Sequence, residues 1–163
     1  MKEALVNFVA NFPHELAVVL LSVIPVAELR LAIPVAIVQY GIPPVEALMF
    51  ACIGNLIPVP FIILFIRKIF KWMKKFKMFR SIVEKLEKRG EEKKSTVEKY
   101  KFWGLFIFVA IPLPGTGAWT GALIAGLMDM RLKKAMPSIT LGVLTAGIIV
   151  TLISTGVLKM VGI

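Results

Sequence analysis

Hydrophobic residues gather in four long blocks separated by short polar links. The blocks cover residues 16–40, 44–66, 102–128 and 136–161. Each approaches the roughly 20 apolar residues that a helix needs to cross a bilayer. Pro, Gly and polar residues interrupt the first and third blocks, and the fourth is rich in Gly and Thr, as closely packed membrane helices often are. The pattern predicts an all-α integral membrane protein, with residues 1–163 forming a single membrane domain.

Composition and charge agree with this prediction. The chain is 58% hydrophobic with a net charge of +10. Residues 67–101 hold 14 Lys/Arg and 5 Asp/Glu, which leaves +9 there and +1 in the remainder. Because Lys and Arg near membrane ends stay inside the cell, this basic segment is expected to be cytoplasmic and to contact anionic lipids. No nucleic-acid-binding motif accompanies it, so we expect no nucleic-acid partner.

The basic segment begins with an amphipathic pattern. Its apolar residues recur at spacings of three, four or seven: Ile69, Met73, Phe76, Val83 and Leu86. This stripe predicts a helix. Two interpretations remain open at this point, a helix lying on the membrane surface and an extension of the second block that packs on its own protein.

The two halves of the chain resemble each other. Three matches carry the resemblance: residues 24–28 with 111–115, Ala47 with Ala135, and Gly54 with Gly142. The first match has an offset of 87 and the others an offset of 88. They define one repeat over 12–66 and a second over 102–163. Interrupted hydrophobic segments at matching positions of two repeats are typical of transporters with a site at the repeat interface.

Charge also decides between two topologies. If the segment 67–101 is cytoplasmic, a third block that crossed once would put the basic link 129–134 outside, against the positive-inside rule. If the first and third blocks are re-entrant hairpins, that link is cytoplasmic, both termini are outside, and the repeats are inverted. We expect the hairpins to bend at prolines: Pro25, Pro34, Pro112 and Pro114. Their tips, 25–34 and 112–121, should meet near the membrane midplane, where irregular backbone must be buried or face water.

Two charges lie inside the first hydrophobic block. Glu28 and Arg30 are the only charged residues in 16–38, and Pro25 and Pro34 bracket them. A charge at the bilayer centre costs at least about 2.5–3.5 kcal/mol, so such residues usually serve function. Arg30 stays charged and its planar fork suits phosphate or carboxylate, whereas desolvation favours the neutral acid and makes Glu28 a candidate proton carrier. The alternative is an internal ion pair that holds the hairpin together.

Other candidate binding residues lie opposite this pair. The second hairpin offers Gly115, Thr116, Gly117, Trp119 and Thr120. Glycines allow a ligand to approach the backbone, although Trp119 is expected to serve packing first. Asn55 sits within the second block, where a buried amide needs partners. His14 is the only histidine and Cys52 the only cysteine, which argues against a His-dependent catalytic triad, a His-rich metal site or a disulfide. We therefore expect no enzyme activity, no cofactor and no metal.

The motifs at residues 28–34 (ELRLAIP) and 112–122 (PLPGTGAWTGA) resemble the putative small multidrug export protein family over nearly the whole chain. That family is in turn similar to the DedA/VTT-domain superfamily of membrane proteins. This similarity implies paired re-entrant hairpins, lipid translocation that includes polyprenyl phosphate recycling, and dependence on the proton motive force. The DedA motif usually carries an arginine where this chain has Gly117, and the only hairpin arginine here is Arg30.

The sequence thus predicts a small transporter in the cell membrane. The first hypothesis is translocation of an anionic amphiphile, a phospholipid or polyprenyl phosphate, through a midplane site with Glu28 and Arg30. An alternative is proton-coupled export of small molecules, and another is a non-transporting membrane scaffold. Expected partners are membrane lipids, the substrate, protons and a second copy, because a dimer would enclose the hairpins better than a monomer.

Overall fold

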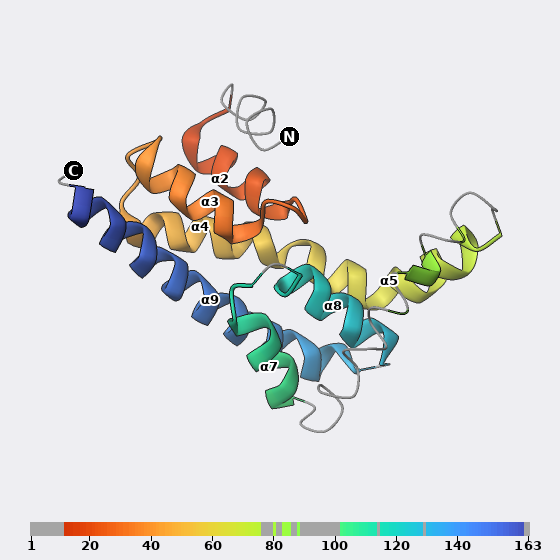
Figure 1. The fold of residues 1–163 in the computed structure, drawn as a ribbon. Coiled ribbons are helices and arrows are strands. Elements are labelled where there is room, and N and C mark those ends of the chain that lie inside the picture. The colour runs from red at the N-terminus through yellow and green to blue at the C-terminus, as the bar shows by residue number, and fades with distance from the viewer. Residues whose placement is uncertain are drawn as a thin grey trace. The chain divides into compact units, whose positions relative to one another are not determined.

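The computed structural model describes residues 12–75, 80, 83–85, 88, 102–113, 115–128 and 130–161 (Figure 1). Within these ranges the regular structure is entirely helical, as predicted. The helices are α2 (His14–Val23), α3 (Glu28–Val38), α4 (Pro44–Leu56), α5 (Pro58–Met73), α7 (Phe102–Ala110), α8 (Ala118–Leu127) and α9 (Leu132–Val161). The predicted residues Phe76, Leu86 and Pro114 lie outside the described ranges.

The chain divides into two compact units. The first unit comprises Met1–Pro58 and Val143–Ile163, and the second comprises Val59–Gly142. In the first unit α2 packs on α3 and α4, and α3 packs on α4. Gly147 of α9 joins this core, because a Cβ there would meet Leu48, Cys52 and Ile33. Small residues let helices approach closely where no hydrophobic force drives them together.

The second unit repeats this plan with different residues. It contains α5, α7, α8 and the first part of α9, and α7 packs on α8. Gly121 and Gly126 of α8 allow close packing, against Val109 of α7 and Ile63 of α5 respectively. The Ser138 hydroxyl of α9 donates a hydrogen bond of 2.6 Å to the Phe102 carbonyl and ties α9 to α7.

One glycine contact occurs in both units at the offset of the sequence repeat. In the first unit a Cβ on Gly54 would collide with the Val19 carbonyl and the Ser22 side chain. In the second unit a Cβ on Gly142 would lie 2.6 Å from the Val109 side chain and 3.0 Å from the Phe106 carbonyl. Val19 and Ser22 correspond to Phe106 and Val109 at an offset of 87 residues. The two glycines are 88 residues apart, as in the sequence match. The long helix of each repeat therefore packs on its hairpin in the same register.

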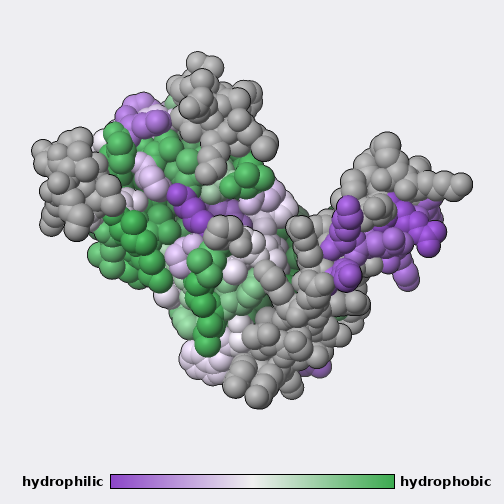
Figure 2. Space-filling model, in the orientation of Figure 1, coloured by the Kyte–Doolittle hydropathy of each residue, from purple (hydrophilic) through white to green (hydrophobic). Residues whose placement is uncertain are grey.

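Helix length separates two classes of segment. Pro44–Ile66 (23 residues) and Leu132–Gly156 (25 residues) are long and apolar enough to cross a bilayer. Within Pro44–Ile66 the single residue Ile57 separates α4 from α5. The first and third hydrophobic blocks are divided by four or more residues into two short helices, α2 and α3 with 10 and 11 residues and α7 and α8 with 9 and 10. A helix of that length spans about 15 Å, half of the roughly 30 Å hydrocarbon core. Figure 2 shows the broad hydrophobic surface over the helices of the first unit.

The predicted proline breaks need one correction. Pro25 lies in the turn between α2 and α3, and Pro112 lies in the loop between α7 and α8. Pro34, however, lies inside α3 and does not end it. The irregular backbone is confined to residues 24–27, so Glu28 and Arg30 belong to the first turn of a helix. Proline removes one backbone donor, and packing on both sides of α3 tolerates that loss.

Candidate functional site

Glu28 sits where the chain turns from α2 into α3. The Ile24 carbonyl accepts hydrogen bonds from the amides of Ala27 (3.1 Å) and Glu28 (2.9 Å), which closes the turn. The Glu28 side chain is only 5% exposed, and its φ angle is 47°. Among the described residues it is the one non-glycine with a positive φ. For an L-residue this backbone region costs roughly 1–2 kcal/mol.

The second repeat shows why this angle arises. Gly115 follows Glu28 at an offset of 87 and also has a positive φ, 85°. The turn of each hairpin therefore demands a residue in the same unusual conformation. Glycine fits that demand without steric cost, and the second repeat has it. The first repeat holds a strained and buried acid instead, and strain of this kind gathers at functional sites.

Arg30 follows two residues later in the first turn of α3. Its side chain is half-buried. Ala27, which precedes the helix, makes no side-chain capping bond, and the start of α3 carries the positive end of the helix dipole. The ring of Pro34 cannot donate to the Arg30 carbonyl. The start of α3 thus combines a cation, a carboxyl group and the positive end of the helix dipole.

Asn55 lies on α4 at about the level of this first turn. Glu28 begins the 11-residue α3, and Asn55 is the next-to-last residue of the 13-residue α4. The two helices are joined by the short link 39–43, so at 1.5 Å per residue both residues are about equally far from the link. Asn55 is fully buried, and neither its Oδ1 nor its Nδ2 finds a partner within the described part of the chain. Its repeat counterpart is Val143, an apolar residue that is equally buried.

The predicted residues of the second hairpin have local structural roles. The Thr116 hydroxyl lies within hydrogen-bond distance of the carbonyls of Ile111 (2.6 Å) and Leu113 (2.7 Å), and it accepts the Leu113 amide at 3.2 Å. It therefore fastens the loop between α7 and α8. Gly117 precedes α8 with a φ of 106°, another angle that favours glycine. Trp119 and Thr120 are half-buried in the first turn of α8.

The predicted site residues therefore divide between the two units. Glu28, Arg30 and Asn55 belong to the first unit, and the residues 115–120 belong to the second. Whether any of these residues binds a ligand stays a prediction. Within the described ranges, no group of three or more His, Cys, Asp and Glu side chains is arranged to hold a metal ion.

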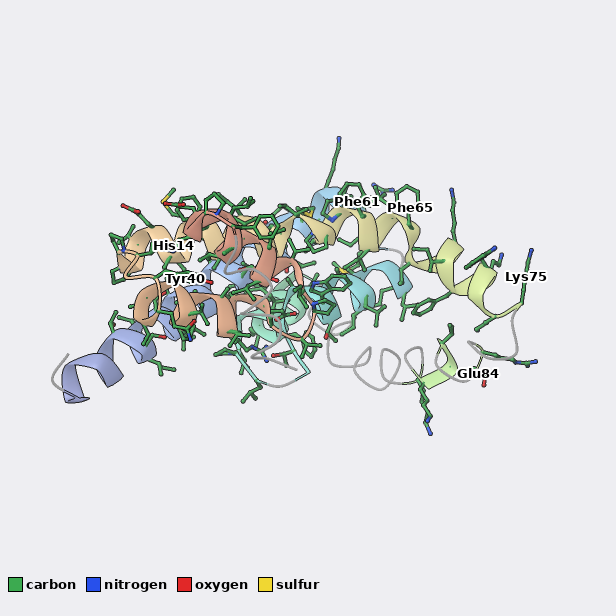
Figure 3. The ribbon with its side chains drawn as sticks, turned by 90° about the horizontal axis from the view of Figure 1, so that it is seen from above. His14, Tyr40, Phe61, Phe65, Lys75 and Glu84 are labelled. Atoms are coloured by element: carbon green, nitrogen blue, oxygen red, sulfur yellow. The ribbon has the colours of Figure 1, made fainter. Side chains whose placement is uncertain are left out.

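Sequence reasoning missed the buried hydroxyl group of Tyr40. The Tyr40 hydroxyl is buried and has no partner among the described residues, and its ring stacks on His14 with centroids 4.5 Å apart (Figure 3). This stack ties the start of α2 to the end of α3, away from Glu28. No sequence signal pointed to it, because the two aromatic residues are far apart in the chain and lie in no motif.

Together these features define an all-helical membrane protein in which short helical hairpins accompany two helices long enough to span the bilayer. The chain belongs to the putative small multi-drug export protein family, whose model matches residues 28–149. That match begins at Glu28 and includes Arg30, Asn55 and the second hairpin. No curated protein and no solved structure gives a significant match to the chain.

Proposed function

We propose that the protein is a membrane transporter whose substrate site lies at the start of α3, with Glu28 and Arg30 as its charged groups. The observation that carries this proposal is the state of Glu28, which is both buried and held at a φ of 47° where the repeat counterpart is glycine. Burial of an ionisable group and a positive φ each cost free energy. A residue with both costs supports a role for its carboxyl group beyond packing. The family description, an exporter, agrees with this class of function.

The membrane arrangement that we propose is a pair of re-entrant hairpins in inverted repeats. It is supported by the lengths of α2, α3, α7 and α8, which reach only about half the hydrocarbon thickness. A hairpin of that size enters the bilayer and leaves on the same side. Site-directed labelling tests this: in a Cys52→Ala background, single cysteines at His14 and Gln39 should react from the same face of the membrane. Labelling from opposite faces would show that the first block crosses.

The substrate class that the site suits best is an anionic amphiphile. The Arg30 guanidinium is always charged and presents a planar fork to phosphate or carboxylate. The start of α3 adds the positive end of the helix dipole, which favours negative charge. The Asn55 amide offers a further donor at about the same level of the unit. A lipid headgroup with a phosphate would match all three groups.

Translocation of a labelled headgroup in proteoliposomes tests this proposal. The assay compares fluorescent phospholipid and polyprenyl phosphate with wild type, Arg30→Ala and a matched control, Arg131→Ala. Arg131 is exposed and precedes α9, so it controls for the general loss of one positive charge. We expect movement with wild type and the control and none with Arg30→Ala. If folded wild-type protein moves neither lipid, passive lipid translocation is wrong.

A second candidate is proton-coupled export of small molecules. It is favoured by the burial of Glu28, because ionisable residues buried within membrane segments usually serve function. This function predicts proton flux triggered by cationic drugs, lost in Glu28→Gln and retained in Arg131→Ala. A non-transporting scaffold instead predicts that folded Glu28→Gln and Arg30→Ala both keep their biological activity.

A further inference from the structure

The outward side of α5 changes sharply from apolar to cationic. Phe61, Leu64 and Phe65 are large apolar residues with 62%, 55% and 46% of their surface exposed. Lys68 and Lys71 follow within the next two turns, and both are exposed. Figure 3 shows Phe61 and Phe65 on the same side of the helix, and Figure 2 shows hydrophilic residues gathered beyond its end.

These residues share one side of α5 because of helical periodicity. Residues three, four or seven apart lie on one face, which places Phe61, Leu64, Lys68 and Lys71 in one stripe of α5. Lys75 follows in the turn after the helix ends at Met73. The opposite side is occupied, since Val59 and Phe70 are buried and Ile63 packs against Gly126 of α8. The stripe is therefore the part of α5 that faces away from its own unit.

The apolar part of this stripe ends where the apolar span ends. In the sequence the second hydrophobic block ends at residue 66 and Arg67 and Lys68 follow, whereas α5 continues to Met73. Trp72 lies in this continuation and is 58% exposed, as expected for an aromatic residue at the level of lipid headgroups. A change from exposed apolar residues to exposed lysines between Phe65 and Lys68 matches the change from acyl chains to headgroups in a bilayer.

Helix stability alone does not explain these lysines. No Asp or Glu occurs between Pro58 and Lys75, so intrahelical ion pairs are not available within that stretch. The helix dipole favours cations in the last turn, which accounts for Lys71. Lys68 lies about one turn earlier, where the dipole contributes little, and it still faces outward.

We propose that this stripe is a binding site for one class of lipid, an anionic phospholipid. The acyl chains lie along Phe61, Leu64 and Phe65, and the negatively charged headgroup contacts Lys68, Lys71 and Lys75. Charge complementarity selects this occupant, because a cationic stripe at headgroup depth attracts an anionic headgroup and gains little from a zwitterionic one. The site is separate from the proposed transport site and does not depend on transport.

Quenching of Trp72 fluorescence measures occupancy of this site. The protein is made with Trp103→Phe and Trp119→Phe, so that Trp72 is the only tryptophan, and is reconstituted with brominated phosphatidylglycerol or brominated phosphatidylcholine. Each lysine at the membrane surface favours an anionic lipid by at most roughly fivefold. For the whole site we expect brominated phosphatidylglycerol to bind at least about threefold more strongly than brominated phosphatidylcholine. High salt should weaken the preference, because exposed charges are screened.

Two sets of variants make the test specific. The triple variant Lys68→Gln, Lys71→Gln, Lys75→Gln should bring the two lipids to equal quenching. The control Lys133→Gln, Lys134→Gln removes exposed lysines at the start of α9 and should keep the preference. Equal quenching in the unaltered stripe would overturn the proposal. Loss of the preference in the α9 control to the same extent would also overturn it, since that result would reflect total charge alone.

Discussion

Replacing Glu28 by glycine should leave the protein more stable than replacing it by alanine. Both changes remove the carboxyl group, so the comparison isolates the backbone. At an ordinary helix position glycine is less favourable than alanine by about 0.8–1.0 kcal/mol. At a φ of 47° the order reverses, because alanine keeps a Cβ in a conformation that suits glycine.

The size of the reversal follows from two opposing terms. A non-glycine residue in the left-handed region costs roughly 1–2 kcal/mol, and glycine loses more backbone entropy on folding, roughly 0.5–1 kcal/mol. The net difference favours glycine by about 1 kcal/mol, which raises Tm by roughly 2–4 °C for a chain of this size. Arg30 supplies the matched control, because it lies in the same helical turn and lacks a positive φ.

Thermal unfolding of the four variants in detergent provides the assay. Glu28→Gly should melt above Glu28→Ala, and Arg30→Gly should melt below Arg30→Ala. The same variants enter the proteoliposome assay, where both Glu28 changes should abolish transport. If Glu28→Gly melts below Glu28→Ala by as much as the Arg30 pair differs, the positive φ is not a property of the folded protein, and the strain reasoning fails.

Three further measurements test the packing and the site. Gly54→Ala and Gly142→Ala should each lower the free energy of unfolding by roughly 1–3 kcal/mol, because the new Cβ has no room. Gly156→Ala should be neutral or stabilising by up to about 1 kcal/mol, since no atom lies within 4 Å of a Cβ there. Equal melting temperatures of all three variants would refute the close packing. Asn55→Val should leave the free energy of unfolding unchanged or raise it by about 1–3 kcal/mol, because it removes two buried polar atoms, and it should abolish transport. Strong destabilisation would mean that the amide has hydrogen-bond partners. Thr116→Val should cost about 1 kcal/mol in unfolding experiments by releasing the loop between α7 and α8, and an unchanged unfolding midpoint would deny its hydroxyl that role.

The hydrophobic pattern of the sequence determined the class of structure. Long apolar blocks need a membrane and helical backbone, because hydrocarbon offers no hydrogen-bond partners. The match of residues 24–28 to 111–115 already aligned Glu28 with Gly115, the two residues that share a positive φ. The family membership likewise agrees with the motifs that were read from the sequence.

Tertiary structure alone decided the state of the candidate site. Pro34 suggested a break, but α3 continues through it because packing on α2 and α4 outweighs the loss of one backbone bond. The burial of Asn55 without a partner in the described part of the chain depends on which helices surround it. The strain of Glu28 depends on how α2 and α3 are joined. Hydrophobic periodicity is a local property of the chain, whereas burial, backbone strain and hydrogen-bond satisfaction are set by neighbours distant in sequence, so only the folded chain reveals them.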